Sequence, residues 1–192
     1  MNLLRAFIAV EIPVEIRAAI GSATAPLQKG TGSIVRWVST DNMHLTLKFL
    51  GDVSPGNVEM LSQMLHAEAG LFNCFYLHLG GLGSFPNLKR PRVIFIGIQS
   101  PPTLEALQRG IESASRRLGY ESEERGFSPH LTIGRVKQNV TATEQQAIRH
   151  VLEATRIDSL GTARVDSVHL YKSDLKPTGS VYTRLYSAPL RK

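Results

Sequence analysis

Two tetrapeptides in the sequence pair a histidine with a threonine two residues later: HLTL at His44–Leu47 and HLTI at His130–Ile133. Histidine has the side-chain pKa nearest neutrality, so it can donate or accept a proton at pH 7. Threonine hydroxyls are neutral donors that can hold the oxygens of an anion. If the two tetrapeptides meet in space, they supply a general base, a general acid and two hydroxyl donors, a set that suits hydrolysis of a phosphodiester.

Both tetrapeptides alternate polar and apolar residues, as a β-strand with one buried face does. Side chains on a strand alternate between its two faces, so the histidine and threonine share one face and the two aliphatic residues share the other. One such tetrapeptide is most often an ordinary strand with a solvated face. Two copies in the same register favour a shared site, in which both polar pairs face one cleft and the aliphatic pairs are buried.

The surroundings of the two tetrapeptides contain no pattern of metal ligands. There is no His-x-x-x-His spacing and no cluster of acidic residues beside either one, so we expect neither a metal ion nor a cofactor. A cyclic phosphate is a suitable substrate for such a site, because ring strain lowers the barrier. One imidazole would activate water and the other would protonate the leaving oxygen.

Composition narrows the class of protein and of partner. The 192 residues include 22 Lys and Arg against 16 Asp and Glu, a net charge of +6 that is compatible with a polyanionic partner. Cys74 is the only cysteine, which excludes an internal disulfide and fits a reducing, cytoplasmic location. The apolar start contains Arg5 and reads as a strand, and no apolar run is long enough to cross a membrane.

The order of predicted elements indicates an α+β fold with largely antiparallel sheets flanked by helices. Helices are predicted to begin at Pro13, after Ser54, at Pro101 and after Thr141 or Thr143, and the glycines at 80–83 are predicted to form a loop. No low-complexity linker divides the chain, so we expect one domain over residues 1–192 and a monomer. The predicted strands are 3–11, 35–38, 44–50, 72–79, 93–98, 131–136, 163–171 and 181–186.

Over nearly its full length the chain resembles the bacterial and archaeal RNA 2′,3′-cyclic phosphodiesterases of the two-histidine phosphoesterase superfamily, historically called 2′-5′ RNA ligases. Besides the two tetrapeptides, the resemblance rests on Arg5–Val10, Val35–Val38, Lys48–Gly51, Gly81–Pro86, Pro91–Val93, Ser128–Pro129, Gly134–Arg135 and Leu170–Ser173, with Gly179 and Tyr182. One HxTx tetrapeptide is a weak signal, whereas two within this framework are a strong one.

The resemblance implies two α+β lobes around a central cleft, with one tetrapeptide from each lobe. It implies that RNA ends, including tRNA-derived ones, or nucleotides with a 2′,3′-cyclic phosphate are opened to the 2′-phosphate. His44 would be the proton donor and His130 the proton acceptor, while Thr46 and Thr132 would bind the phosphate. The symmetry of the two tetrapeptides does not distinguish the two histidine roles.

The predicted positions of two further residues, Arg135 and Phe49, depend on whether side chains alternate strictly along their strands. The resemblance suggests that Arg135 reaches the phosphate, yet strict alternation from His130 places it on the opposite face. Both can hold only if the strand bulges or twists around Gly134. By the same alternation Phe49 is expected in the core, although it could instead offer a face on which a base stacks.

Three alternatives to the hydrolase stay open. The chain could be a reversible 2′-5′ RNA ligase, a phosphodiesterase for another cyclic nucleotide-like metabolite, or a non-catalytic RNA-binding module. A binding module needs no matched acid and base, so the intact pair of tetrapeptides favours catalysis.

Overall fold

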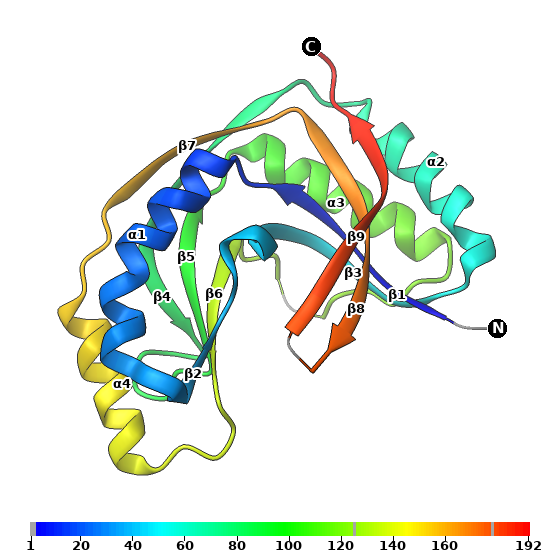
Figure 1. Cartoon of the computed structure of the whole chain (residues 1–192). Helices are drawn as coiled ribbons and strands as arrows, with labels where there is room; N and C mark the ends of the chain where they lie inside the picture. The colour runs from blue at the N-terminus through cyan, green and yellow to red at the C-terminus, as the bar shows by residue number, and fades with distance from the viewer. Residues whose placement is uncertain (1–2, 125, 178) are drawn as a thin grey trace.

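The computed structural model describes residues 3–124, 126–177 and 179–192, in which helices and strands are interspersed along the chain (Figure 1). The helices are α1 (Val14–Thr31), α2 (Val58–Ala69), α3 (Pro102–Arg117) and α4 (Ala142–Ala154). The strands are β1 (Leu4–Glu11), β2 (Val35–Trp37), β3 (His44–Val53), β4 (Phe75–Phe85), β5 (Val93–Gln99), β6 (His130–Val136), β7 (Ser159–Val165), β8 (Ser167–Lys176) and β9 (Gly179–Pro189).

The strands form two antiparallel sheets. One has four strands in the order β3-β1-β8-β9, and the other has five in the order β2-β6-β5-β4-β7. The first HxTx tetrapeptide opens β3 in the four-stranded sheet and the second opens β6 in the five-stranded sheet. The predicted α+β fold, with one tetrapeptide in each lobe, is therefore confirmed. Each sheet draws strands from both halves of the chain.

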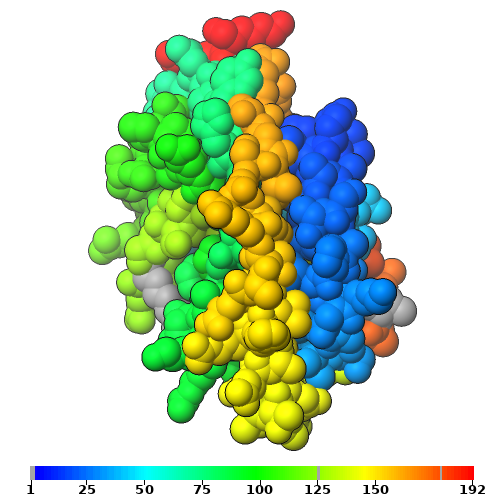
Figure 2. All heavy atoms as spheres, turned by 90° about the vertical axis from the view of Figure 1, so that its left-hand side faces the viewer, coloured from blue at the N-terminus to red at the C-terminus, as the bar shows by residue number. Residues whose placement is uncertain are grey.

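The helices cover the outer sides of the two sheets. Helix α2 packs on β8 and β9 and contacts α3, while α1 and α4 pack beside the five-stranded sheet. Figure 2 shows α1 (blue) and α4 (yellow) side by side on this outer face. Within the described ranges, no helix is long and apolar enough to cross a membrane.

Helix α4 follows Thr141, the first of the two threonines after which this helix was predicted to begin. The Thr141 hydroxyl accepts from the Glu144 backbone N–H at 3.2 Å, and the Glu144 carboxylate accepts from the Thr141 N–H at 2.7 Å. This reciprocal capping box satisfies two backbone donors that a helix end leaves free.

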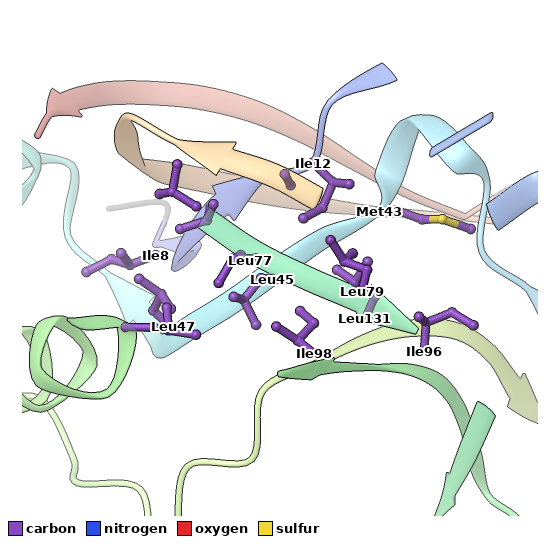
Figure 3. Close-up of a cluster of buried hydrophobic side chains, with 14 of the residues drawn as sticks. Ile8, Ile12, Met43, Leu45, Leu47, Leu77, Leu79, Ile96, Ile98 and Leu131 are labelled. Atoms are coloured by element: carbon purple, nitrogen blue, oxygen red, sulfur yellow. The ribbon is translucent and has the colours of Figure 1, made fainter. Parts of the chain in front are cut away.

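The aliphatic residues of both tetrapeptides lie in one apolar core. Leu45 and Leu131 come from different sheets, yet both belong to a single cluster of buried side chains that also contains Ile8, Leu79 and Ile96 (Figure 3). Burial of each such side chain contributes about 1.5–3 kcal/mol to the free energy of folding. The predicted burial of the aliphatic pairs is confirmed, and it anchors the two histidine-bearing strands.

The prediction of a loop at residues 80–83 is wrong, because β4 runs through these glycines with shifts of register. A Cβ atom on Gly83 would lie 2.4 Å from Cζ of Phe95, and one on Gly80 would lie 2.1 Å from the Asp158 carbonyl oxygen. The glycines therefore allow close approach of neighbouring groups within the sheet and do not mark a turn.

The predicted strand 163–171 is two strands. Strand β7 ends at Val165 in the five-stranded sheet, and β8 begins at Ser167 in the four-stranded sheet. The alternation of buried and exposed residues changes phase here, since Val165 and Val168 are both buried although they are three positions apart. The chain passes from one lobe to the other at this point, which the sequence pattern did not reveal.

Candidate active site

Both tetrapeptide histidines are held in the same way. Each is half-buried at the start of its strand, and β3 and β6 contact each other. Nδ1 of His44 lies 2.8 Å from the carbonyl oxygen of Asn42, and Nδ1 of His130 lies 2.7 Å from that of Ser128. A carbonyl only accepts, so each Nδ1 carries the hydrogen. Neither Nε2 has a hydrogen-bond partner among the described residues, which leaves this nitrogen for proton exchange.

Strand β3 contains a β-bulge directly after the first HxT sequence. Its pairing with β1 moves from Ala9 opposite Thr46 to Ile8 opposite Lys48, so Leu47 is an extra residue. The alternation therefore changes phase: Lys48 is buried, and Phe49 is 57% exposed on the face that carries His44 and Thr46. The prediction that Phe49 lies in the core is wrong for this reason.

Strand β6 contains the same bulge at the equivalent residue. Its pairing with β5 moves from Phe95 opposite Thr132 to Ile94 opposite Gly134, so Ile133 is the extra residue. Arg135 is exposed on the face that carries the second histidine and threonine. Strict alternation would place Arg135 on the opposite face from His130. The extra residue in the bulge shifts the alternation by one position, so both side chains lie on the same face.

Aromatic rings pack against the first histidine. The ring of Phe7 stacks on His44 at 4.7 Å, and Tyr182 meets it edge-on at 5.1 Å between centroids. Tyr171 also stacks on Phe7, at 5.3 Å between centroids, and its ring lies 6.5 Å from that of His44. Burial among these rings lowers the pKa of His44 below its usual value, and the hydrogen bond with Asn42 opposes this effect.

The second histidine has a matching pair of aromatic neighbours. Phe85 and Phe95 lie 4.9 Å and 5.3 Å from His130 between ring centroids, and they stack on each other at 4.5 Å. Each imidazole is therefore fixed by a backbone carbonyl and by two aromatic rings. This preorganisation orients both Nε2 atoms before a substrate binds.

A cavity of about 280 Å³ borders His44 on the four-stranded sheet, and Glu11, Arg184 and Tyr182 line it. The Glu11 carboxylate accepts hydrogen bonds from the Tyr171 hydroxyl and, at 3.3 Å, from Nη1 of Arg184. Sequence reasoning missed Glu11 and Arg184. No local pattern links Glu11 to Arg184, which lies at the other end of the chain.

A larger cavity of about 710 Å³ lies along the second half of β3, with Phe49 in its wall and Tyr120 and the loop 121–124 among its lining. Sequence reasoning also missed this loop. Lys48 fixes it from the interior, donating to the Glu112 carboxylate at 2.9 Å and to the Glu121 carbonyl oxygen.

The described part of the chain therefore places the predicted residues on two faces. His44 and Thr46 share the face of β3, and His130, Thr132 and Arg135 share the face of β6. No group of three or more His, Cys, Asp or Glu side chains in these described ranges gathers in a way that could hold a metal ion.

Several proteins of known sequence are similar to this chain over almost its whole length. A protein of Methanothermobacter thermautotrophicus named RNA 2′,3′-cyclic phosphodiesterase is 31% identical, over 94% of this chain and 95% of its own. A protein of Thermotoga maritima with the same name is 32% identical, over 95% and 94% of the two chains.

Solved structures show the same similarity in three dimensions. The protein TT0787 of Thermus thermophilus superposes with a TM-score of 0.82 at 28% identity, over 97% of this chain and 98% of its own. Escherichia coli LigT, solved in complex with 3′-AMP, superposes with a TM-score of 0.76 at 30% identity over the full length of both chains.

The sequence profile of one family covers both tetrapeptides and Arg135. The profile of the 2′-5′ RNA ligase superfamily matches residues 2–177. Together with the two bulged strands and the paired imidazoles, this match establishes that the chain belongs to the 2′-5′ RNA ligase superfamily.

Proposed function

We propose that the protein hydrolyses the 2′,3′-cyclic phosphate of RNA ends or nucleosides to the 2′-phosphate, without a metal ion. The observation that carries this proposal is the matched setting of the two imidazoles, each with Nδ1 bonded to a carbonyl and Nε2 without a partner in the described chain. The names of the relatives, which are RNA 2′,3′-cyclic phosphodiesterases, support the same substrate.

The proposed reaction places the phosphorus atom between the two Nε2 atoms. His130 takes a proton from a water molecule, whose oxygen attacks the phosphorus in line with the bond to the 3′-oxygen. That bond breaks, and the 3′-oxygen takes a proton from His44. The products are a 2′-phosphate and a 3′-hydroxyl. Each such acid or base role is worth about 10²–10⁴ in rate.

Neutral and charged donors would hold the non-bridging oxygens during this reaction. The hydroxyls of Thr46 and Thr132 lie on the same faces as the histidines. Arg135 would add charge-assisted hydrogen bonds, which are stronger than neutral ones and grow as negative charge develops on the phosphate.

The role of His44 as proton donor requires its protonated form. In the free protein burial lowers its pKa, which favours the neutral imidazole. A bound phosphate places negative charge beside the ring and favours the imidazolium. Substrate binding itself would thus favour the protonated form of His44 that the proton donor requires.

The exposed Phe49 ring would contact the base of the bound nucleotide. It is the one large apolar side chain that the bulge turns out of β3 toward the larger cavity. Aromatic rings stack on nucleobases with little sequence preference, since every base has a π-face.

The test is an assay with cytidine 2′,3′-cyclic phosphate in excess EDTA, with the product identified by phosphorus NMR. We expect cytidine 2′-phosphate from the wild type and at least about a hundredfold slower turnover from H44A and from H130A. H150A, in which an exposed histidine of α4 is removed, is the matched control and should retain the wild-type rate.

Four outcomes of this assay and of its extension to RNA would contradict or change the proposal. Absence of 2′-phosphate in EDTA would overturn the proposal, and RNA binding without turnover would favour a binding module. Joining of RNA ends through a 2′-5′ bond would show the ligase reaction, in which a 5′-hydroxyl attacks the cyclic phosphate in place of water. Turnover of another cyclic nucleotide-like metabolite in preference to RNA ends would assign a different substrate.

We also propose that the chain acts as one two-lobed domain and as a monomer in the cytoplasm, on RNA ends that include tRNA-derived ones. The continuous apolar core that joins both sheets supports a single folding unit. One cooperative unfolding transition and a monomer mass in light scattering would be the expected results.

A further inference from the structure

Two arginines lie directly opposite each other beside the second histidine. In the ladder between β2 and β6, Arg36 is the cross-strand partner of Arg135. Both are exposed, and neither forms an ion pair or a side-chain hydrogen bond with any residue in the described ranges. Directly opposed residues of an antiparallel pair project from the same face of the sheet.

Arg36 therefore shares the face of His130. Its neighbours Val35 and Trp37 project to the other side, where they crowd the position that a Cβ of Gly134 would occupy, at 2.9 Å and 3.1 Å. This packing fixes β2 and leaves the Arg36 side chain on the open face.

Two like charges in directly opposed positions destabilise a strand pair. By contrast, two arginines that line the cavity beside His44 are neutralised: Arg184 is paired with Glu11 at 3.3 Å and Arg17 with Asp41 at 3.4 Å. The pair formed by Arg36 and Arg135 is therefore arranged for negative charge that comes from outside the chain.

We propose that Arg36 binds the phosphodiester that precedes the cyclic phosphate in an RNA end, and so makes the enzyme prefer RNA ends to free nucleoside cyclic phosphates. This inference rests on the proposed function, in which Arg135 contacts the cyclic phosphate. Adjacent strands are about 4.8 Å apart. An RNA strand that leaves the site across β6 therefore meets Arg36 next.

The position of β2 in the sheet fits this path. It is the edge strand of the five-stranded sheet, with β6 as its only neighbour in that sheet. The face beyond Arg36 is therefore not covered by another strand of the sheet, and an RNA strand can continue past it. A contact with phosphate carries no base preference, which suits an enzyme that acts on many ends.

The test compares kcat/KM for cytidine 2′,3′-cyclic phosphate with kcat/KM for a trinucleotide that ends in the same group. In R36Q we expect the preference for the trinucleotide to fall by about tenfold. The slope of log kcat/KM against log salt for the trinucleotide should become shallower by about 0.7, as expected for the loss of one phosphate contact in a single strand. R109Q removes the same charge from the exposed face of α3 and should retain the wild-type preference.

An unchanged preference in R36Q would overturn the inference, and so would an equal loss on both substrates. A second measurement does not require turnover: fluorescence anisotropy with a labelled trinucleotide that ends in a 2′-phosphate. If the wild type hydrolyses neither substrate, the proposed function fails, yet weaker binding by R36Q than by R109Q would still support the phosphate contact. Equal binding by the two variants would show that Arg36 does not contact the phosphate.

Discussion

Phe49 and Arg135 occupy equivalent positions in two different strands. Each lies five residues after an HxTx histidine, beyond a β-bulge at the fourth residue of the tetrapeptide. The bulge turns each side chain onto the histidine face of its strand. The two lobes therefore share the same β-bulge, which exposes an aromatic ring in one lobe and a guanidinium group in the other.

The guanidinium should act on the cyclic phosphate itself. Replacement of Arg135 by Gln removes charge-assisted hydrogen bonds worth about 1.5–3 kcal/mol, so kcat/KM should fall by roughly 10–100-fold. The loss should be the same for nucleoside and trinucleotide substrates, in contrast to R36Q. Because Arg135 is exposed, the thermal midpoint should stay close to that of the wild type. A loss of less than about threefold would remove Arg135 from the phosphate site.

The aromatic ring should act on binding. Replacement of Phe49 by Ala should raise KM with little change in kcat, because the ring would contact the base and not the reacting atoms. Stacking is worth about 1–3 kcal/mol per base, and F49W should retain it. L175A removes a similarly exposed apolar side chain on β8 and serves as the control. An unchanged KM in steady-state kinetics would show that the base lies elsewhere.

The same bulge that exposes Phe49 buries the preceding lysine. Lys48 is 4% exposed, and its ammonium group lies 2.9 Å from the Glu112 carboxylate. In K48M this carboxylate loses its partner, so urea denaturation should show a loss of about 2–3 kcal/mol, moderated because Glu112 is partly exposed. The double variant K48M/E112L removes both charges and should be more stable than K48M alone. Equal stability of the two would show that the carboxylate left without its lysine has no cost in K48M.

The periodicity of the sequence predicted which side chains of each tetrapeptide are buried, because alternation is a local property of a strand. It did not predict the bulges, since an extra residue in one strand is defined only by its pairing with another. Lys48 and Phe49 therefore exchanged faces relative to expectation. Gly134, at the position equivalent to Lys48, was the one local hint, and β2 packs against it.

Contacts across long stretches of chain were also beyond the sequence. Glu11 and Arg184 meet at 3.3 Å although they lie near opposite ends of the chain. Their pairing depends on the order β1-β8-β9, in which strands from both ends share a sheet. No motif encodes that order, although the spacing of the two tetrapeptides and the resemblance to a family both indicated a two-lobed arrangement.

The ionisation of His44 gives a prediction that needs no turnover. Desolvation by the surrounding rings favours the neutral imidazole, so its pKa in the free protein should lie below 6.5. Sulfate is a suitable probe, because its charge stays constant over the titration. A bound dianion favours the imidazolium, so saturating sulfate should raise this pKa. By linkage, sulfate should bind more tightly as the pH falls through the titration of His44.

Carbon-13 NMR of labelled histidine measures both quantities, with the His44 resonance assigned by its absence from H44A. Sulfate affinity in H44A should lose the part of its pH dependence that His44 contributes, while R109Q should behave as the wild type. If His44 titrates above 6.5 without sulfate, its rings do not desolvate it as the structure indicates. If sulfate leaves the pKa of His44 unchanged, the anion binds away from this imidazole, and substrate binding cannot convert it into the proton donor.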